Sequence, residues 1–219
     1  MVYLFDICGT LYKSNTTYDF IGYYLKKHNR IKYLYYKSLF SLPAKIFFKI
    51  LNLFGKNEGV RKFIVGFIAG ADKRELDAAS ADFIKDFLSQ KKIDVTHEML
   101  KSKTENNERV VLVSASVDPV VKAIAQHLGV AEYCSTILEY DEGTATGRIL
   151  FDLEKSKLKY LLDNQIVSEN QNMAVFTDSF ADLDIALVSY ECTIICSAND
   201  RQKWRKILSA NHKINFIDA

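Results

Sequence analysis

The feature that most constrains the fold is an alternation of short apolar or β-branched runs with helical segments in the second half of the chain. The runs cover residues 110–113, 134–140, 173–176 and 193–195. After the first run, apolar residues recur at helical spacing until Gly129, a residue type that commonly follows a helix C-terminus. Strand–helix alternation of this kind predicts an α/β fold with a doubly wound, Rossmann-like parallel sheet.

One further apolar run lies near the N-terminus. Residues 2–5 are all apolar, and they stop at Asp6, which is followed by Gly9 and Thr10. Four apolar residues that end in an acid and a glycine turn indicate a buried strand with a carboxylate at its C-terminal end.

The stretch between these two regions has helical character. Residues 14–101 show apolar spacings of three and four, and Asp72 with Glu75 gives a capping-box-like helix start. We therefore predict a core domain of residues 1–13 and 102–219, with a helical cap domain, residues 14–101, inserted after the first strand.

Composition and charge limit the classes of function. The 219 residues are 48% hydrophobic and 26% charged, which indicates a globular chain and excludes disordered and collagen-like classes. Their net charge of +2 gives no reason to expect nucleic acid as a partner. The four cysteines show neither disulfide-scaffold nor zinc-ligand spacing, and the first residues lack the features of a signal peptide. We therefore predict a cytoplasmic protein with reduced thiols.

Reactive side chains follow the predicted strands. They are Asp6, Ser114, a lysine near residues 155–157, and Asp178 with Asp182. Because parallel strands present their carboxyl ends at one edge of a sheet, we expect these side chains to meet there. Carboxylate oxygens bind Mg²⁺, and a hydroxyl, an ammonium and backbone N–H groups bind phosphate. The set therefore predicts magnesium-dependent phosphoryl chemistry.

Four ordered motifs resemble those of the haloacid dehalogenase (HAD) superfamily. They are Asp6-Ile7-Cys8-Gly9-Thr10-Leu11, Val113-Ser114-Ala115-Ser116, the lysine, and Asp178-Ser179-Phe180-Ala181-Asp182. The gap after the first motif is where members of subfamily I insert a helical cap. The stretch from Leu138-Glu139-Tyr140 to Thr146-Gly147-Arg148-Ile149 is similar to the phosphoserine phosphatase-like branch. The resemblance covers essentially the whole chain and implies a HAD-IB hydrolase.

The resemblance also implies roles for the motif residues in hydrolysis of a phosphate monoester. Asp6 would be the nucleophile that forms an aspartyl-phosphate. The Ser114 hydroxyl and the Ala115 backbone N–H would bind the phosphoryl group, and a lysine would hold it beside the nucleophile. We favour Lys157 for that lysine because apolar residues follow it at the usual spacing, and Lys155 stays open as the alternative.

A magnesium ion is the implied cofactor. By the resemblance, Asp6 and Asp178 would bind Mg²⁺ through their carboxylates and Cys8 through its backbone carbonyl, while Asp182 would support the metal site. Thr177 is a mild departure from the family pattern, because a glycine usually precedes the aspartate of this motif.

Cys8 is the larger departure. The family's phosphatases have at this position a second aspartate, which acts as general acid and base. Such proton transfer contributes about 10²- to 10⁴-fold, and a thiol with a pKa of about 8.5 is a poor substitute near neutral pH. Hydrolysis should therefore be slow. The alternatives are a catalytically weakened relative that binds a phosphorylated ligand, and a hydrolase of phosphonates or carbon–halogen bonds.

Residues 26–62 form a basic and aromatic stretch. They contain ten Lys or Arg and one acid, Glu58. Lys45, Lys49 and Lys56 would share one helical face, and no uncharged span is long enough to cross a membrane. The pattern fits a helix at an anionic membrane surface or, alternatively, a cap helix that packs its aromatic side chains on the core. A loose resemblance to phosphatidylglycerophosphate phosphatases suggests a small phosphorylated substrate that is lipid- or polyprenyl-linked.

Overall fold

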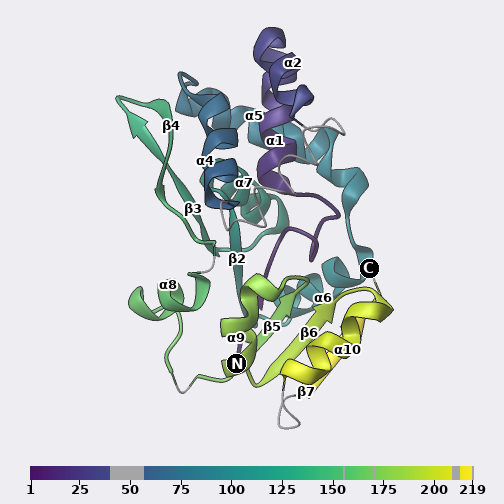
Figure 1. The fold of residues 1–219 in the computed structure, drawn as a ribbon. Helices are drawn as coiled ribbons and strands as arrows, with labels where there is room; N and C mark the ends of the chain where they lie inside the picture. The colour runs from purple at the N-terminus through teal and green to yellow at the C-terminus, as the bar shows by residue number, and fades with distance from the viewer. Residues whose placement is uncertain (40–56, 155, 170, 209–212, 219) are drawn as a thin grey trace.

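The computed structural model describes residues 1–39, 57–154, 156–169, 171–208 and 213–218. Within them, one seven-stranded sheet has the order β4-β3-β2-β1-β5-β6-β7 (Figure 1). The strands are β1 (Val2–Phe5), β2 (Arg109–Val117), β3 (Glu132–Asp141), β4 (Thr144–Phe151), β5 (Met173–Thr177), β6 (Glu191–Ile195) and β7 (Lys213–Ile217). Neighbouring strands are parallel except β3 and β4, which form an antiparallel hairpin. The predicted α/β fold with a parallel sheet is confirmed.

Helices cover both faces of the sheet. In Figure 1, α9 (Leu183–Val188) and α10 (Ala198–Ile207) lie in front of it and α6 (Asp94–Glu105) lies behind. Val2 and Leu4 pack with residues of α8 (Lys157–Asp163) and α9, whereas Tyr3 and Phe5 pack in the cluster that includes α6 and α7 (Asp118–Leu128). Since successive side chains of a strand point to opposite faces, β1 is apolar at all four positions because both its faces are buried.

The described part of the segment after β1 is mainly helical. It contains α1 (Thr16–His28), α2 (Arg30–Ser38), α4 (Asn57–Val65) and α5 (Lys73–Asp86), with short 3₁₀ turns η1 (Gly66–Ile68) and η2 (Leu88–Lys91). Asp72 caps α5 as expected, because its carboxylate accepts the N–H of Arg74 at 2.8 Å and that of Glu75 at 3.3 Å. The predicted helical segment after the first strand is confirmed, whereas Lys45, Lys49 and Lys56 lie outside the described residues.

The two connections between the sheet and the helical segment lie side by side. The Lys13 N–H donates to the Lys91 carbonyl at 2.8 Å, and the Ile93 N–H donates to the Leu11 carbonyl at 2.9 Å. These bonds fix the chain that follows β1 against the chain that enters α6. The helical segment therefore leaves and rejoins the sheet at a single point.

The boundaries of the two predicted domains stay a prediction. α6 spans the expected boundary after residue 101, since it ends at Glu105 and packs against β2. Among the described helices, none is long and apolar enough to cross a lipid bilayer.

Candidate active site

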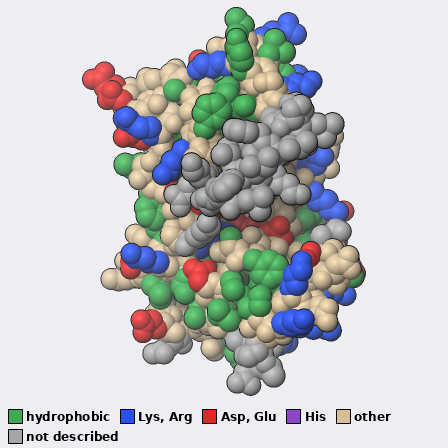
Figure 2. Space-filling view, viewed as in Figure 1, with side chains coloured by type: hydrophobic (Ala, Val, Ile, Leu, Met, Phe, Trp, Pro, Cys, Tyr) green, Lys and Arg blue, Asp and Glu red, His purple; other side chains and the backbone are tan. Residues whose placement is uncertain are grey.

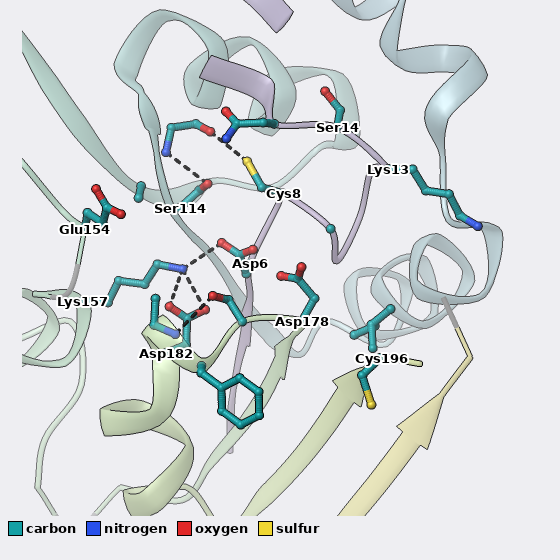
Figure 3. Close-up of a pocket in the computed structure, with 18 of the residues that line it drawn as sticks. Asp6, Cys8, Lys13, Ser14, Ser114, Glu154, Lys157, Asp178, Asp182 and Cys196 are labelled. Carbon is teal, nitrogen blue, oxygen red and sulfur yellow. Dashed lines mark hydrogen bonds and ion pairs between the residues drawn. The ribbon is translucent and has the colours of Figure 1, made fainter. Parts of the chain in front are cut away.

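The side chains of the four motifs meet at the carboxyl ends of the strands (Figure 3). Asp6 follows β1, Ser114 lies within β2, Lys157 begins α8 and Asp178 follows β5. With Asp182 they line a cavity of about 890 Å³. Because parallel strands end at the same edge, residues as far apart in sequence as Asp6 and Lys157 become neighbours.

Lys157 joins two of the carboxylates. Its Nζ donates to Asp6 Oδ1 and to Asp182 Oδ2, both at 2.8 Å. Burial opposes the charge on Lys157, but the attraction of the two carboxylates outweighs it and raises the pKa of the lysine. Lys157 is therefore a permanent positive charge inside the site. Lys155, the alternative for the motif lysine, lies outside the described residues.

The carboxyl groups of Asp6 and Asp178 are both costly to ionise. Burial raises the pKa of Asp6 to about 6, and the Lys157 charge offsets this only in part. Burial, and then repulsion by Asp6, raises the pKa of Asp178 to about 7. When ionised, these two groups and Asp182 carry three negative charges against the single positive charge of Lys157, and a bound cation would offset that excess.

Gly9 allows the loop after Asp6 to approach Asp178. Its φ is +70°, in the left-handed region that favours glycine. A Cβ at this position would lie 2.0 Å from Asp178 Oδ2. Two separate features therefore require a glycine here: the positive φ of the backbone and the close approach of the Asp178 carboxylate.

The segment expected to bind phosphate interrupts the regular pairing of β2 with β3. Between Val113 and Val117, three residues of β2 stand opposite one residue of β3. Ser114 Oγ accepts the N–H of Ser116 at 3.3 Å, so the Ser114 hydroxyl keeps its own proton for donation. Residues 114–116 all line the cavity.

The Cys8 thiol points away from the Asp6 carboxylate (Figure 3). Its Sγ is hydrogen-bonded to Thr16 Oγ1 at 3.1 Å and to Ser116 Oγ at 3.2 Å, and it accepts the Thr16 N–H at 3.4 Å. The hydroxyls of Thr16 and Ser116 also bond to each other. Burial, and then the nearby charge of Asp6, raises the pKa of the thiol. Cys8 is therefore a protonated thiol near neutral pH.

Thr177 has a structural role at the position where the family usually has glycine. Its Oγ1 donates to Asp182 Oδ2 at 2.7 Å. Asp182 thus accepts bonds from both Thr177 and Lys157, and this holds its carboxylate in one orientation.

Arg61 is a site residue that sequence reasoning missed. It lies on α4, is largely buried, and lines the cavity. Its Nη2 donates to the Ala115 carbonyl and, at 3.0 Å, to Thr136 Oγ1. Its Nε lies 3.2 Å from Asp152 Oδ2 and 3.8 Å from Glu154 Oε2. The arginine thus connects the helical segment to the loop of residues 114–116 and to the chain that leads into α8.

No sequence signal distinguished Arg61 from the other nine basic residues of the stretch 26–62. Its partners Thr136, Asp152 and Glu154 belong to none of the four motifs. An arginine beside a distant acid can be recognised only when the fold has brought the two together.

The donor set fits a hard divalent cation. Asp6 and Asp178 supply carboxylate oxygens across Gly9, in surroundings with excess negative charge. No group of three His, Cys, Asp or Glu side chains within the described ranges is arranged to hold a metal by itself. A magnesium ion here would therefore need further oxygens from backbone, water or phosphate, which is usual for this ion.

Comparison with known protein families gives the same class of protein as the motifs of this site. Residues 3–187 match the family described as haloacid dehalogenase-like hydrolase, and the chain belongs to that family. The resemblance predicted from the motifs is confirmed. The phosphoserine phosphatase SerB1 of Mycobacterium tuberculosis is 23% identical over 186 residues, which cover 82% of this chain. The chain spans 59% of the length of the curated relatives that it matches.

Solved structures share the fold. A protein with unknown function from Bordetella pertussis Tohama I has a TM-score of 0.73 at 19% identity, with 98% of this chain and 97% of that chain covered. A phospho-aspartyl intermediate analogue of phosphoserine phosphatase has a TM-score of 0.56 at 16% identity, with 98% and 92% covered. Phosphoserine phosphatase-like proteins are thus among the structural relatives, as expected.

Proposed function

We propose that this HAD-like hydrolase is a Mg²⁺-dependent phosphatase that cleaves a phosphate monoester through an aspartyl-phosphate on Asp6. The observation that supports it most is the position of the Lys157 ammonium, 2.8 Å from Asp6 and 2.8 Å from Asp182, beside the Ser114 hydroxyl in one cavity. A carboxylate held by a buried cation suits attack on a phosphoryl group, whose charge the same cation offsets. The phosphoserine phosphatases among the relatives support the same chemistry.

Hydrolysis would take two displacements. An Asp6 carboxylate oxygen bonds to phosphorus while the ester P–O bond breaks, and the alkoxide that leaves takes a proton from solvent water. The Ser114 hydroxyl and the Ala115 N–H bind the phosphoryl oxygens, and Lys157 balances their charge. Water then attacks phosphorus and releases a proton to solvent, the bond to Asp6 breaks, and inorganic phosphate leaves with the carboxylate restored.

Asp6, Asp178 and the Cys8 backbone carbonyl would hold the Mg²⁺, and Asp182 would support the site through its bond to Lys157. When bound, the ion would neutralise charge on the phosphoryl oxygens. The protein groups alone would orient the nucleophile and keep Lys157 between the two carboxylates.

Cys8 would make turnover slow. Its raised pKa and its bonds to Thr16 and Ser116 are unfavourable for proton exchange with a leaving group or water. The same contacts favour a second candidate function, that of a catalytically weakened relative which binds a phosphorylated ligand without hydrolysing it.

The substrate would be a small phosphorylated molecule, and the predicted cap, residues 14–101, would cover it. Phosphoserine is the first candidate, because a curated relative is named for it. Lipid- and polyprenyl-linked phosphates remain candidates from the basic stretch alone. Cytoplasmic location and peripheral membrane contact also remain proposals.

A phosphatase screen tests the proposal. The full chain would be assayed with Mg²⁺ against phosphoserine, sugar phosphates and lipid or polyprenyl phosphates, with Asp6→Asn as the blank. We expect phosphate release that is slow, Mg²⁺-dependent and absent in the blank. Release that Asp6→Asn retains would refute the assigned nucleophile. Halide release from a haloacid without Mg²⁺ would instead support the carbon–halogen alternative.

A further inference from the structure

α2 exposes three large apolar side chains on one face. Ile31, Leu34 and Tyr35 are 71%, 67% and 68% exposed. At 100° per residue they fall within an arc of about 100° around the helix. The opposite face is fixed to the protein, because Tyr36 is buried and its hydroxyl donates to the Tyr18 carbonyl at 2.6 Å. The exposed arc is therefore not the face by which α2 packs.

Basic side chains border this face. Arg30 and Lys37 are exposed and lie about 40° and 60° beyond Leu34 around the helix. α2 itself contains no acid, and residues 20–57 contain eight Lys or Arg and no Asp or Glu. An apolar face bordered by cations is the composition of helices that lie in a membrane interface.

The position of α2 at one end of the molecule would let it contact a flat surface. The helix forms one end of the molecule, at the opposite end from α9 and α10 (Figure 1). At that end, hydrophobic side chains project beside Lys and Arg side chains (Figure 2). A projecting end with positive charge complements the plane of a negatively charged bilayer.

We propose that the α2 face, formed by Ile31, Leu34 and Tyr35 with Arg30 and Lys37, docks on an anionic lipid bilayer. The three apolar side chains enter the interface, and the two cations contact lipid phosphates. The contact is peripheral. The docking proposal goes beyond the proposed phosphatase chemistry. Vesicle binding needs no turnover, so a failure of the docking proposal would leave the phosphatase proposal intact.

Vesicle co-sedimentation of the full chain tests the proposal. We expect binding to vesicles of phosphatidylglycerol and phosphatidylcholine in equal parts, weaker binding at high salt, and little binding to phosphatidylcholine alone. Absence of binding, or equal binding to both vesicle types, would overturn the proposal.

Matched variants locate the surface. Leu34→Gln should lower the partition coefficient at least about tenfold, because the side chain no longer adds apolar burial. Leu150→Gln is its control, since Leu150 is 69% exposed but lies on β4. Arg30→Gln and Lys37→Gln should each lower it about fivefold. Equal losses for Leu34→Gln and Leu150→Gln would refute the assignment to α2.

Insertion of α2 into the bilayer can be followed by tryptophan fluorescence. The only tryptophan of the chain, Trp204, is fully buried, so a tryptophan introduced on α2 can report on contact with lipid. Tyr35→Trp should give an additional emission that shifts to the blue when anionic vesicles are added. Binding without that shift would reject the apolar contact.

Two other occupants of the face predict different results. If another part of this chain covered it, Leu34→Gln would lower the unfolding temperature, whereas we expect no change. If a second copy covered it, the free protein would self-associate and Leu34→Gln would abolish that association. Either result would overturn the membrane proposal.

Discussion

At the residue scale, Cys8 is the residue that we expect to limit catalysis most. Its thiol keeps its proton because burial raises its pKa, and its hydrogen bonds are to Thr16 and Ser116. Ser114, Ala115 and Lys157, the groups proposed to bind phosphate, line the same cavity as Asp6. We therefore expect binding of a phosphorylated ligand to be retained and proton transfer to be the weak step.

Cys8→Asp should raise kcat on a phosphomonoester by about 10²- to 10⁴-fold, because it supplies the missing acid and base. The measurement is phosphate release with Mg²⁺ at saturating substrate. Cys8→Ser adds no titrating acid and should give no increase. If Cys8→Asp were no faster than the natural chain, Cys8 would not limit hydrolysis.

Gly9→Ala should lower both stability and activity. The substitution puts a side chain at positive φ and forces the Asp178 carboxylate to move. We expect a loss of about 1–3 kcal/mol in the free energy of unfolding, measured in urea, and at least about tenfold in activity.

Gly143→Ala separates the two causes, because Gly143 has φ +82° and no atom within 4 Å of an added Cβ. It should lose stability and keep its activity. Equal loss of activity in both variants would show that the approach to Asp178 is unimportant.

At the element scale, the sequence predicted most strands but missed β7, at one edge of the sheet. The apolar runs at residues 110–113 and 173–176 lie in β2 and β5, which are buried on both faces. β7 was missed because Lys213 and Asn215 interrupt its apolar residues, so its five residues form no continuous apolar run. Its side chains are only partly buried, and the hydrophobic pattern of a strand is weaker where its faces are less covered.

Arg61→Met tests the connection between α4 and the sheet. The change leaves Asp152 without its cation, and the Arg61 side chain is only 10% exposed. We expect a loss of about 2–4 kcal/mol in the free energy of unfolding, measured by urea denaturation. Addition of Asp152→Asn should recover part of it, since the two residues interact.

The control for Arg61→Met is Arg148→Met. Arg148 also pairs with an acid, Glu139, but its side chain is 73% exposed. Such exposed pairs contribute about 1 kcal/mol or less. If the two variants lost equal stability, the buried network around Arg61 would have no special role.

At the scale of the whole molecule, the site joins segments from both halves of the chain. Asp6 and Asp178 follow β1 and β5, and the burial of their charges together with their mutual repulsion opposes folding. A cation bound between them should therefore stabilise the entire fold and not a single loop.

Mg²⁺ at about a hundred times its Kd should add about 2.7 kcal/mol to the free energy of unfolding, which corresponds to a rise of about 5–10 °C in Tm. Thermal denaturation with Mg²⁺ and then with EDTA measures this, and EDTA should reverse the rise. Asp178→Asn should abolish the rise, and Asp163→Asn, an exposed change on α8, should retain it. A rise that Asp178→Asn preserves would place the ion elsewhere.

The sequence by itself determined the parallel α/β core, the helical segment after β1 and the residues at the strand ends. These are local properties, because periodicity and the residue that ends a run can be read without knowledge of contacts. Only the tertiary structure decided that Cys8 contacts Ser116, 108 positions away, and that Arg61 contacts Ala115, 54 positions away. It also decided that Ile31, Leu34 and Tyr35 face outward while Tyr36 is buried. Such contacts depend on how distant elements pack, and no local pattern in the sequence records that packing.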